Sequence, residues 1–135
     1  MISDNNKNRS ASVAHGTYNA EGAGIKHDAG KLQWHLLPMK YLRGVVQVLM
    51  YGANKYAPHN WRRGMPYTQV YNAMQRHLDA YMDGIDNDAD TGLSHLDHAM
   101  CCLMFLKAYS VEFPEHDDRF INPRNQIGRE ELTNA

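Results

Sequence analysis

The chain has 135 residues, of which 43% are hydrophobic and 21% are charged, as is ordinary for a single globular domain. Its formal net charge of −1 gives no reason to expect nucleic acid or a membrane surface as a partner. No apolar run is long enough to cross a bilayer or to act as a secretion signal, so we expect a cytoplasmic protein. The cysteines Cys101 and Cys102 are adjacent, which excludes a disulfide scaffold.

Composition along the chain divides it into three parts. Residues 1–25 are rich in Asn, Ser, Ala and Gly, so we expect a disordered N-terminal arm. Residues 26–112 carry the helical periodicity and should form the functional domain. Residues 113–135 are polar and contain prolines, which is typical of an irregular C-terminal tail.

The first helices are expected at residues 30–36, as a short segment, and at residues 38–56. Pro38 suits the first position of the longer helix. Its apolar residues recur at helical spacing: Leu42, Val45, Val46, Leu49, Met50 and Ala53. No stretch alternates with a period of two residues, so the sequence predicts an all-α fold.

Two further helices are expected at residues 68–83 and 91–109. Thr68 can cap the first of them and Gly84 can end it. The second is apolar nearly all round, so it should be the most central helix. Helices of this length form a thin core, and we therefore expect more surface to be buried in a homodimer or homotetramer.

The charges are segregated along the chain. Residues 26–76 hold eight basic residues and one acid, whereas residues 77–98 hold six aspartates and no Lys or Arg. This pattern suits two solvated faces, or a cationic surface for an anionic substrate beside carboxylates for a divalent metal.

Histidines lie on the predicted inward faces of two helices. His95, His98 and Cys102 share one stripe because spacings of three and four residues return to the same side of a helix. His77 points inward from the preceding helix, and antiparallel packing across the loop would bring it near His95 and His98. Any one of them could be a hydrogen-bonded core residue, but the group favours a functional site.

The loop at residues 84–92 carries aspartates at alternate positions, as calcium-binding loops do. Thr91 stands where such a loop needs Gly, and Asp97 where it needs Glu, so the match is poor. A solvated turn remains an alternative. Carboxylates together with imidazoles suit Mg²⁺ or Mn²⁺.

A stretch at residues 51–64 combines cations, an amide and aromatic rings. Lys and Arg can hold phosphate oxygens, and Trp61 or Tyr56 can stack on a base. The same composition could belong to a loop packed by its own rings. The candidate substrate-binding residues are Lys31, Lys55, Asn60, Trp61, Arg62, Arg63 and Arg76.

Several short motifs occur in a characteristic order: residues 28–31, 37–38, 52–56, 60–64, 76–78 and 88–98. Together they resemble the MazZ-like family of phage dATP/dGTP diphosphohydrolases, which is a MazG-like branch of the all-α NTP pyrophosphatases. The resemblance covers about residues 26–107. It implies a four-helix bundle, oligomers, Mg²⁺ or Mn²⁺, and cleavage between the α- and β-phosphates. It also implies a supply of dGMP for 2-aminoadenine nucleotides, in the host cytoplasm.

The sequence departs from the metal-binding pattern of the MazG-like enzymes. No Glu occurs between Glu21 and Glu112, and Ile85 stands where the family carries Glu. The resemblance places the second acidic motif on His95 and His98. The metal ligands implied are His77, Asp83, Asp86, Asp90, His95 and His98. The catalytic residues implied are Asp83, Asp86 and His95.

We therefore expect a metal-dependent diphosphohydrolase that converts dGTP, with dATP as a second candidate, to the monophosphate and pyrophosphate. One alternative is an HD-type triphosphohydrolase, although the only His-Asp pairs, His27-Asp28 and His116-Asp117, lie outside the central helices. Another is a non-enzymatic module that binds nucleotide or calcium.

Overall fold

The computed structural model describes residues 22–126, so most of the expected N-terminal arm and the last residues of the tail, 127–135, lie outside it. The chain divides into two compact units, 1–37 and 38–135, which are described separately. The described part of the first unit holds the 3-10 helix η1, Trp34–Leu36, where a short helix was predicted. Before it, the Lys31 N–H donates to the Asp28 carbonyl at 3.0 Å and closes a turn.

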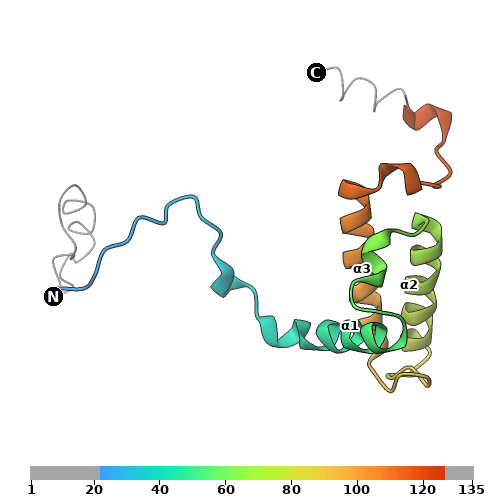
Figure 1. Cartoon of the computed structure of the whole chain (residues 1–135), viewed down its shortest axis with the longest axis horizontal. Coiled ribbons are helices and arrows are strands. Elements are labelled where there is room, and N and C mark those ends of the chain that lie inside the picture. The colour runs from blue at the N-terminus through green and yellow to red at the C-terminus, as the bar shows by residue number, and fades with distance from the viewer. Residues whose placement is uncertain (1–21, 127–135) are drawn as a thin grey trace. The chain divides into compact units, whose positions relative to one another are not determined.

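The described residues of the second unit form helices joined by loops (Figure 1). Its elements are η2 Met39–Leu42, α1 Arg43–Lys55, η3 Asn60–Arg63, α2 Tyr67–Met82, α3 His95–Glu112 and η4 Pro114–His116. The long helices α2 and α3 run antiparallel, and α1 packs against α3. Within residues 22–126 the pairing of extended backbone is limited to isolated bridges such as Asn87 with Ser94. The predicted all-α class is therefore confirmed.

One end of α2 differs from the prediction and the other agrees with it. Thr68 does not cap the helix, because Pro66 occupies the N-cap position and the Thr68 N–H donates to an Asp118 carboxylate oxygen at 2.9 Å. Gly84 ends the helix as predicted, with a φ of 85° that suits glycine. The Ile85 N–H then donates to the Ala80 carbonyl at 3.0 Å.

Helix α3 begins four residues later than the expected start at Thr91. Ser94 is its N-cap, and the Ser94 hydroxyl accepts a hydrogen bond from the Leu96 N–H at 3.1 Å. This bond satisfies one of the amides that the first turn of a helix leaves unpaired. Residues 91–94 therefore belong to the loop.

The core lies at the end of the helix pair where α2 begins and α3 ends. Tyr67, Val70 and Tyr109 are buried there. The Tyr67 hydroxyl donates to the carbonyls of Tyr109 and Phe113 at 2.8 and 3.1 Å. The Tyr109 hydroxyl donates to the Trp61 carbonyl, and burial raises the pKa of Tyr109 to about 12. These bonds join α2, α3 and η3.

Helix α1 approaches α3 closely at one point. A Cβ atom on Gly44 would overlap the Asp97 carboxylate, so only glycine fits at this contact. Val45 is buried beside it. In the part of the chain that is described, no helix combines the length and the apolar character that a membrane span requires.

Candidate metal centre

Three histidines meet at the other end of the helix pair. The Nδ1 atoms of His77 and His95 lie 2.8 Å apart. The His77 ring stacks on His98, with ring centroids 4.5 Å apart and planes 5° apart. His95 is buried, with 7% of its surface exposed. The convergence expected from the helical spacing is thus present.

The loop between α2 and α3 folds back over these rings. The Asp88 N–H donates to the Leu93 carbonyl and the Gly92 N–H donates to the Asp88 carbonyl, both at 2.8 Å. The His95 N–H donates to the Asp86 carbonyl at 2.9 Å. These backbone bonds fix the loop against the start of α3 and turn Asp88 toward the histidines.

Asp88 completes a cluster that could hold a cation. One ligand atom each from His77, Asp88 and His95 lies within 4.8 Å of the others. The carboxylate is anchored through Oδ2, which accepts hydrogen bonds from the backbone amides of Asp90 and Thr91 at 3.2 and 3.0 Å. Asp88 was not among the expected ligands. The sequence signal that could have singled it out is an Asp three residues before a Thr in a turn. The side chain of such an Asp accepts hydrogen bonds from nearby backbone amides and is therefore fixed in direction.

Burial and neighbouring charges set the protonation of the cluster. Burial lowers the pKa of His77 and of His98, and the neighbouring imidazoles lower it further. Burial also acts to raise the pKa of Asp88, but hydrogen bonds from Thr91 and the nearby imidazoles outweigh it, so that this pKa is lowered. Near pH 7 these lowered pKa values leave His77 and His98 neutral and Asp88 ionised, which are the forms that bind metal.

The other expected metal ligands lie outside the cluster. Asp83, Asp86 and Asp90 are exposed, and Asp86 and Asp90 contribute backbone groups to the loop. His98 adjoins the cluster through its stacking on His77. Its Nε2 lies 2.7 Å from the Thr91 hydroxyl. Thr91 thus contacts Asp88 of the cluster through its N–H, and the adjoining His98 through its hydroxyl.

The expected base-stacking residue Trp61 already has a partner within the fold. Its ring stacks on Phe105, with centroids 4.7 Å apart and planes 14° apart, and the Arg62 guanidinium lies 5.2 Å from the Trp61 ring. A base would therefore have to share Trp61 with these groups.

The expected phosphate-binding cations are exposed. Lys55 lies over the Tyr56 ring at 5.3 Å, and Asn60 and Arg63 lie in η3. Arg76 precedes His77 on α2, and its charge helps to lower the pKa of His77. Lys31 belongs to the first unit.

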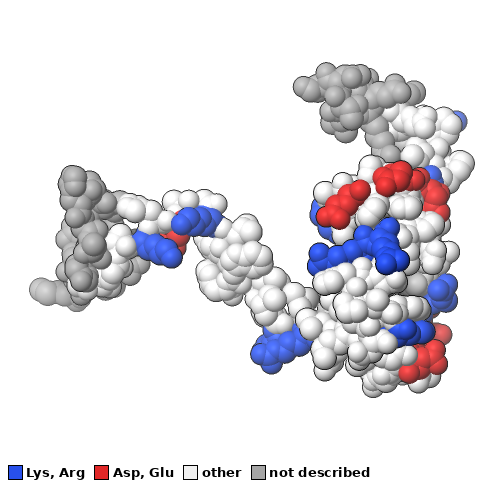
Figure 2. All heavy atoms as spheres, viewed as in Figure 1, with Lys and Arg blue, Asp and Glu red and all other residues white. Residues whose placement is uncertain are grey.

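Charges are unevenly distributed over the surface of the helical unit. Figure 2 shows basic side chains in the middle of one face of this unit, with acidic side chains toward both of its ends. One acidic end holds the aspartates that follow α2, and the His77–Asp88–His95 cluster lies there. Cations and carboxylates are thus both present on the unit that holds the cluster.

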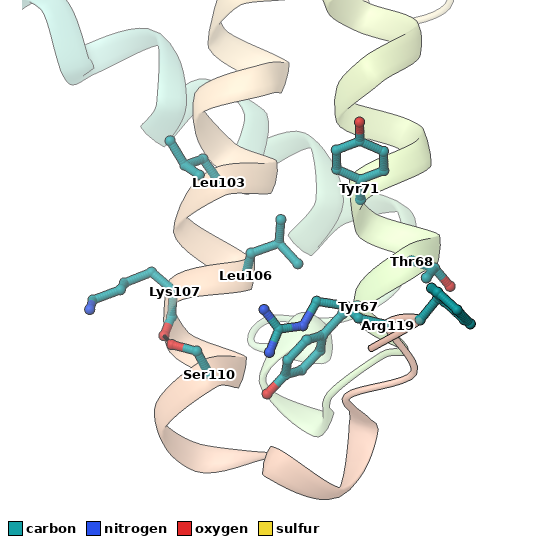
Figure 3. A pocket seen from close by; sticks show the side chains of 9 residues that line it. Tyr67, Thr68, Tyr71, Leu103, Leu106, Lys107, Ser110 and Arg119 are labelled. Carbon is teal, nitrogen blue, oxygen red and sulfur yellow. Dashed lines mark hydrogen bonds between the residues drawn. The ribbon is translucent and has the colours of Figure 1, made fainter. Parts of the chain in front are cut away.

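A cavity of about 520 Å³ lies elsewhere on the helix pair (Figure 3). Its lining comes from α2, α3 and the segment after η4: Tyr67, Thr68, Tyr71, Leu103, Leu106, Lys107, Ser110, Arg119 and Phe120. Tyr67 and His77 are ten residues apart on α2, or about 15 Å along the helix axis. The lining contains no imidazole or carboxylate, so the cavity does not supply the chemistry of the cluster.

Comparison with known proteins identifies the family of the chain. Residues 21–119 match the family described as dATP/dGTP diphosphohydrolase, N-terminal. A protein of Salmonella phage PMBT28 named dATP/dGTP diphosphohydrolase is 35% identical over 96 residues, which are 71% of this chain. The chain spans only about a third of that relative, 33% of its length. No solved structure matches. The chain belongs to the dATP/dGTP diphosphohydrolase N-terminal family.

Proposed function

We propose that this protein hydrolyses purine deoxynucleoside triphosphates to the monophosphate and pyrophosphate with the help of a divalent metal ion. The observation that carries the proposal is the His77–Asp88–His95 cluster, which lies within the segment that matches the family. We propose dGTP as the main substrate and dATP as a second one. The dGMP formed would feed the synthesis of 2-aminoadenine nucleotides in a phage-infected cell.

The residues of the cluster fit a metal ion. Two imidazole nitrogens and a carboxylate oxygen converge, and burial lowers the pKa of His77, which keeps that imidazole neutral near pH 7. A bound divalent ion would supply a Lewis acid that makes water a better nucleophile and neutralises phosphate charge. Three protein ligands leave coordination positions for substrate, as in catalytic metal sites.

The chain's own residues would bind and orient the triphosphate. Arg76, next to His77 in sequence, offers a cation close to the cluster. Lys55, Arg62 and Arg63 are exposed on the same unit, where their charges can attract the anionic substrate and the leaving pyrophosphate. Asn60 and Trp61 remain our candidates for contacts with the base.

We also propose that the protein works as a homodimer or homotetramer. Large apolar side chains are exposed on α2 and α3, among them Tyr71, Met82 and Leu103, and the cavity opens beside two of them. A second copy would cover these side chains and add to a thin core.

A panel of deoxynucleotides tests the activity. Pure protein is incubated with each dNTP and Mg²⁺, Mn²⁺ or Co²⁺, and the products are separated by chromatography. We expect dGMP and pyrophosphate from dGTP. Release of triphosphate would instead support the HD-type alternative, and release of orthophosphate alone would reject cleavage at the α-phosphate.

Substitution at the cluster tests its part in the reaction. Asp88→Asn keeps the shape of the side chain but removes its charge, so we expect it to abolish pyrophosphate release. Asp79→Asn is the matched control, because Asp79 is an exposed residue of α2 that bonds to Gln75. Equal activity of the two variants would contradict the proposed site.

A further inference from the structure

We propose that His77, Asp88 and His95 form a site for a first-row transition-metal ion, of the Mn²⁺, Co²⁺ or Zn²⁺ class, that discriminates against Mg²⁺. This inference rests on the proposed function, because the ion is the one that hydrolysis would use. The sequence suggests Mg²⁺ and Mn²⁺ equally, whereas these three ligands favour a transition-metal ion over Mg²⁺.

The two nitrogen donors are already close to ligand spacing. Nitrogens bound to one ion at about 2.1 Å lie about 3.0 Å apart in adjacent octahedral positions, and about 3.4 Å apart in a tetrahedron. The Nδ1 atoms of His77 and His95 lie 2.8 Å apart. A shift of a few tenths of an ångström would therefore admit the ion between them and replace their mutual hydrogen bond.

The oxygen donor is fixed in place by the loop. Both backbone amides that bond to the Asp88 carboxylate reach its Oδ2 atom. Among the described contacts these bonds leave Oδ1 available to a cation. Because the loop already holds the carboxylate within 4.8 Å of the imidazole nitrogens, the ordering of this ligand costs little when an ion enters, and this favours binding.

A surrounding set of contacts orients the ligands. His98 stacks in parallel on His77, and the Thr91 hydroxyl lies 2.7 Å from His98 Nε2. The same hydroxyl accepts a hydrogen bond from the Leu93 N–H at 3.2 Å. Partners that hold ligand rings in this way tune metal affinity, so Thr91 is a positioning residue.

The chemistry of the donors decides the class of ion. Mg²⁺ prefers oxygen ligands in a regular octahedron and retains its waters, whereas imidazole suits Ni²⁺ and Zn²⁺, and sites with nitrogen ligands bind Co²⁺ more tightly than Mn²⁺. Two of the three donors here are nitrogens. The affinity should therefore rise from Mn²⁺ to Co²⁺ and stay far above that for Mg²⁺.

Metal titration of the full chain tests the site without reference to turnover. Protein stripped with a chelator is titrated with Co²⁺, and binding is followed by visible d–d absorption and by calorimetry. We expect one Co²⁺ per chain and an affinity for Mg²⁺ weaker by on the order of 100-fold or more. Equal affinities for Mg²⁺ and Co²⁺ would overturn the inference.

Variants locate the ion. Asp88→Asn and His95→Gln should lose Co²⁺ binding, whereas Asp79→Asn should retain it. Thr91→Val should weaken binding by about 10- to 100-fold and alter the Co²⁺ spectrum, and Thr91→Ser, which keeps the hydroxyl, should restore both. Circular dichroism of each metal-free variant confirms that it is folded. Unchanged Co²⁺ binding in folded Asp88→Asn or His95→Gln would place the ion elsewhere and overturn the proposal.

Paramagnetic NMR of the wild-type chain locates the ion even if a ligand variant does not fold. Mn²⁺ added to the wild-type chain should broaden the imidazole resonances of His77, His95 and His98 before those of the other five of its eight histidines. Uniform broadening would contradict the site.

The outcomes separate this inference from the proposed function. Pyrophosphate release with Mg²⁺, together with no Co²⁺ at the cluster, would reject the inference and leave the hydrolase in place. Specific Co²⁺ binding at the cluster without hydrolysis of any dNTP would uphold the metal site and reject the hydrolase.

Discussion

His77 and His98 lie face to face in a partly buried setting that disfavours their charged forms. Burial is the main cause of the lowered pKa of each, and each also has a second imidazole nearby. Protonation of either ring would place a positive charge against the other ring, with Asp88 near both rings and Asp97 near His98 to compensate in part. The stacked pair is therefore a feature of the neutral state.

Acid should destabilise the metal-free protein through these two residues. An unfolded histidine binds its proton near pH 6.5, whereas the folded rings take up protons only at lower pH, so the unfolded state binds more protons in this range. The free energy of unfolding should fall as the pH drops from about 7.5 to about 5.5. Thermal unfolding at the two pH values measures it. His98→Gln should reduce the difference, and an unchanged difference would reject this cause.

The buried hydroxyl of Tyr109 should contribute measurably to stability. Tyr109→Phe removes its hydrogen bond and leaves the Trp61 carbonyl without this donor, so we expect a loss of about 1–2 kcal/mol in the free energy of unfolding. Urea titration provides the measurement. Tyr71→Phe serves as the control, since Tyr71 is 51% exposed and should change little. Equal effects of the two variants would contradict the role of the buried bond.

Single residues differ in how far the sequence predicts them. His77 and His95 could be predicted as neighbours because helical periodicity fixes which face of a helix each one occupies. Asp88 could not be chosen from the aspartates around it, because its direction is set by a hydrogen bond to the Leu93 carbonyl and by bonds from the amides of Gly92 and Thr91. Trp61 could be predicted to be important, but its packing on Phe105 depends on where η3 meets α3.

At the scale of elements, the approach of α1 to α3 depends on the missing side chain of Gly44. Gly44→Ala would place a methyl group on the Asp97 carboxylate, so the Asp97 side chain must turn away or the helices must move apart. We expect a loss of about 1–3 kcal/mol in the free energy of unfolding. Gly52→Ala is the matched control in the same helix, because nothing lies within 4 Å of its new methyl group.

The control should change stability in the opposite direction. Alanine favours a helix over glycine by about 0.5–1 kcal/mol, so Gly52→Ala should raise the midpoint of urea unfolding. Similar shifts for both variants would show that helix propensity, and not the contact with Asp97, governs Gly44.

Helices were easier to predict than their ends. The apolar period identified all three long helices, because burial of one face imposes that period on the sequence. All three starts differ from the prediction. Helix α1 begins at Arg43 and not at Pro38, because residues 39–42 form the 3-10 helix η2. The starts of α2 and α3 differ because Thr68 and Thr91 use their polar groups in tertiary bonds, to Asp118 and to His98. A Thr can either cap a helix or form a tertiary hydrogen bond, and which of the two it does depends on the neighbours that the fold brings to it.

At the scale of the molecule, apolar side chains on the helix pair point to self-association. Leu103 is 58% exposed and Tyr71 is 51% exposed, and both line the cavity between α2 and α3. Leu103→Glu would place a charge in the surface that we propose a second copy covers, so it should shift the protein toward monomer. Sedimentation velocity measures the mass, and circular dichroism confirms folding. A monomeric wild-type protein would contradict the proposed assembly.

Different interactions hold the antiparallel helices α2 and α3 together at the two ends of the pair. Tyrosine hydroxyls bond to carbonyls at one end, and imidazoles and Asp88 meet at the other. Each end should therefore open on its own. Removal of the ion proposed for this cluster should speed amide hydrogen exchange and proteolytic nicking in the loop at residues 84–94, while amides around Tyr67 and Tyr109 stay protected.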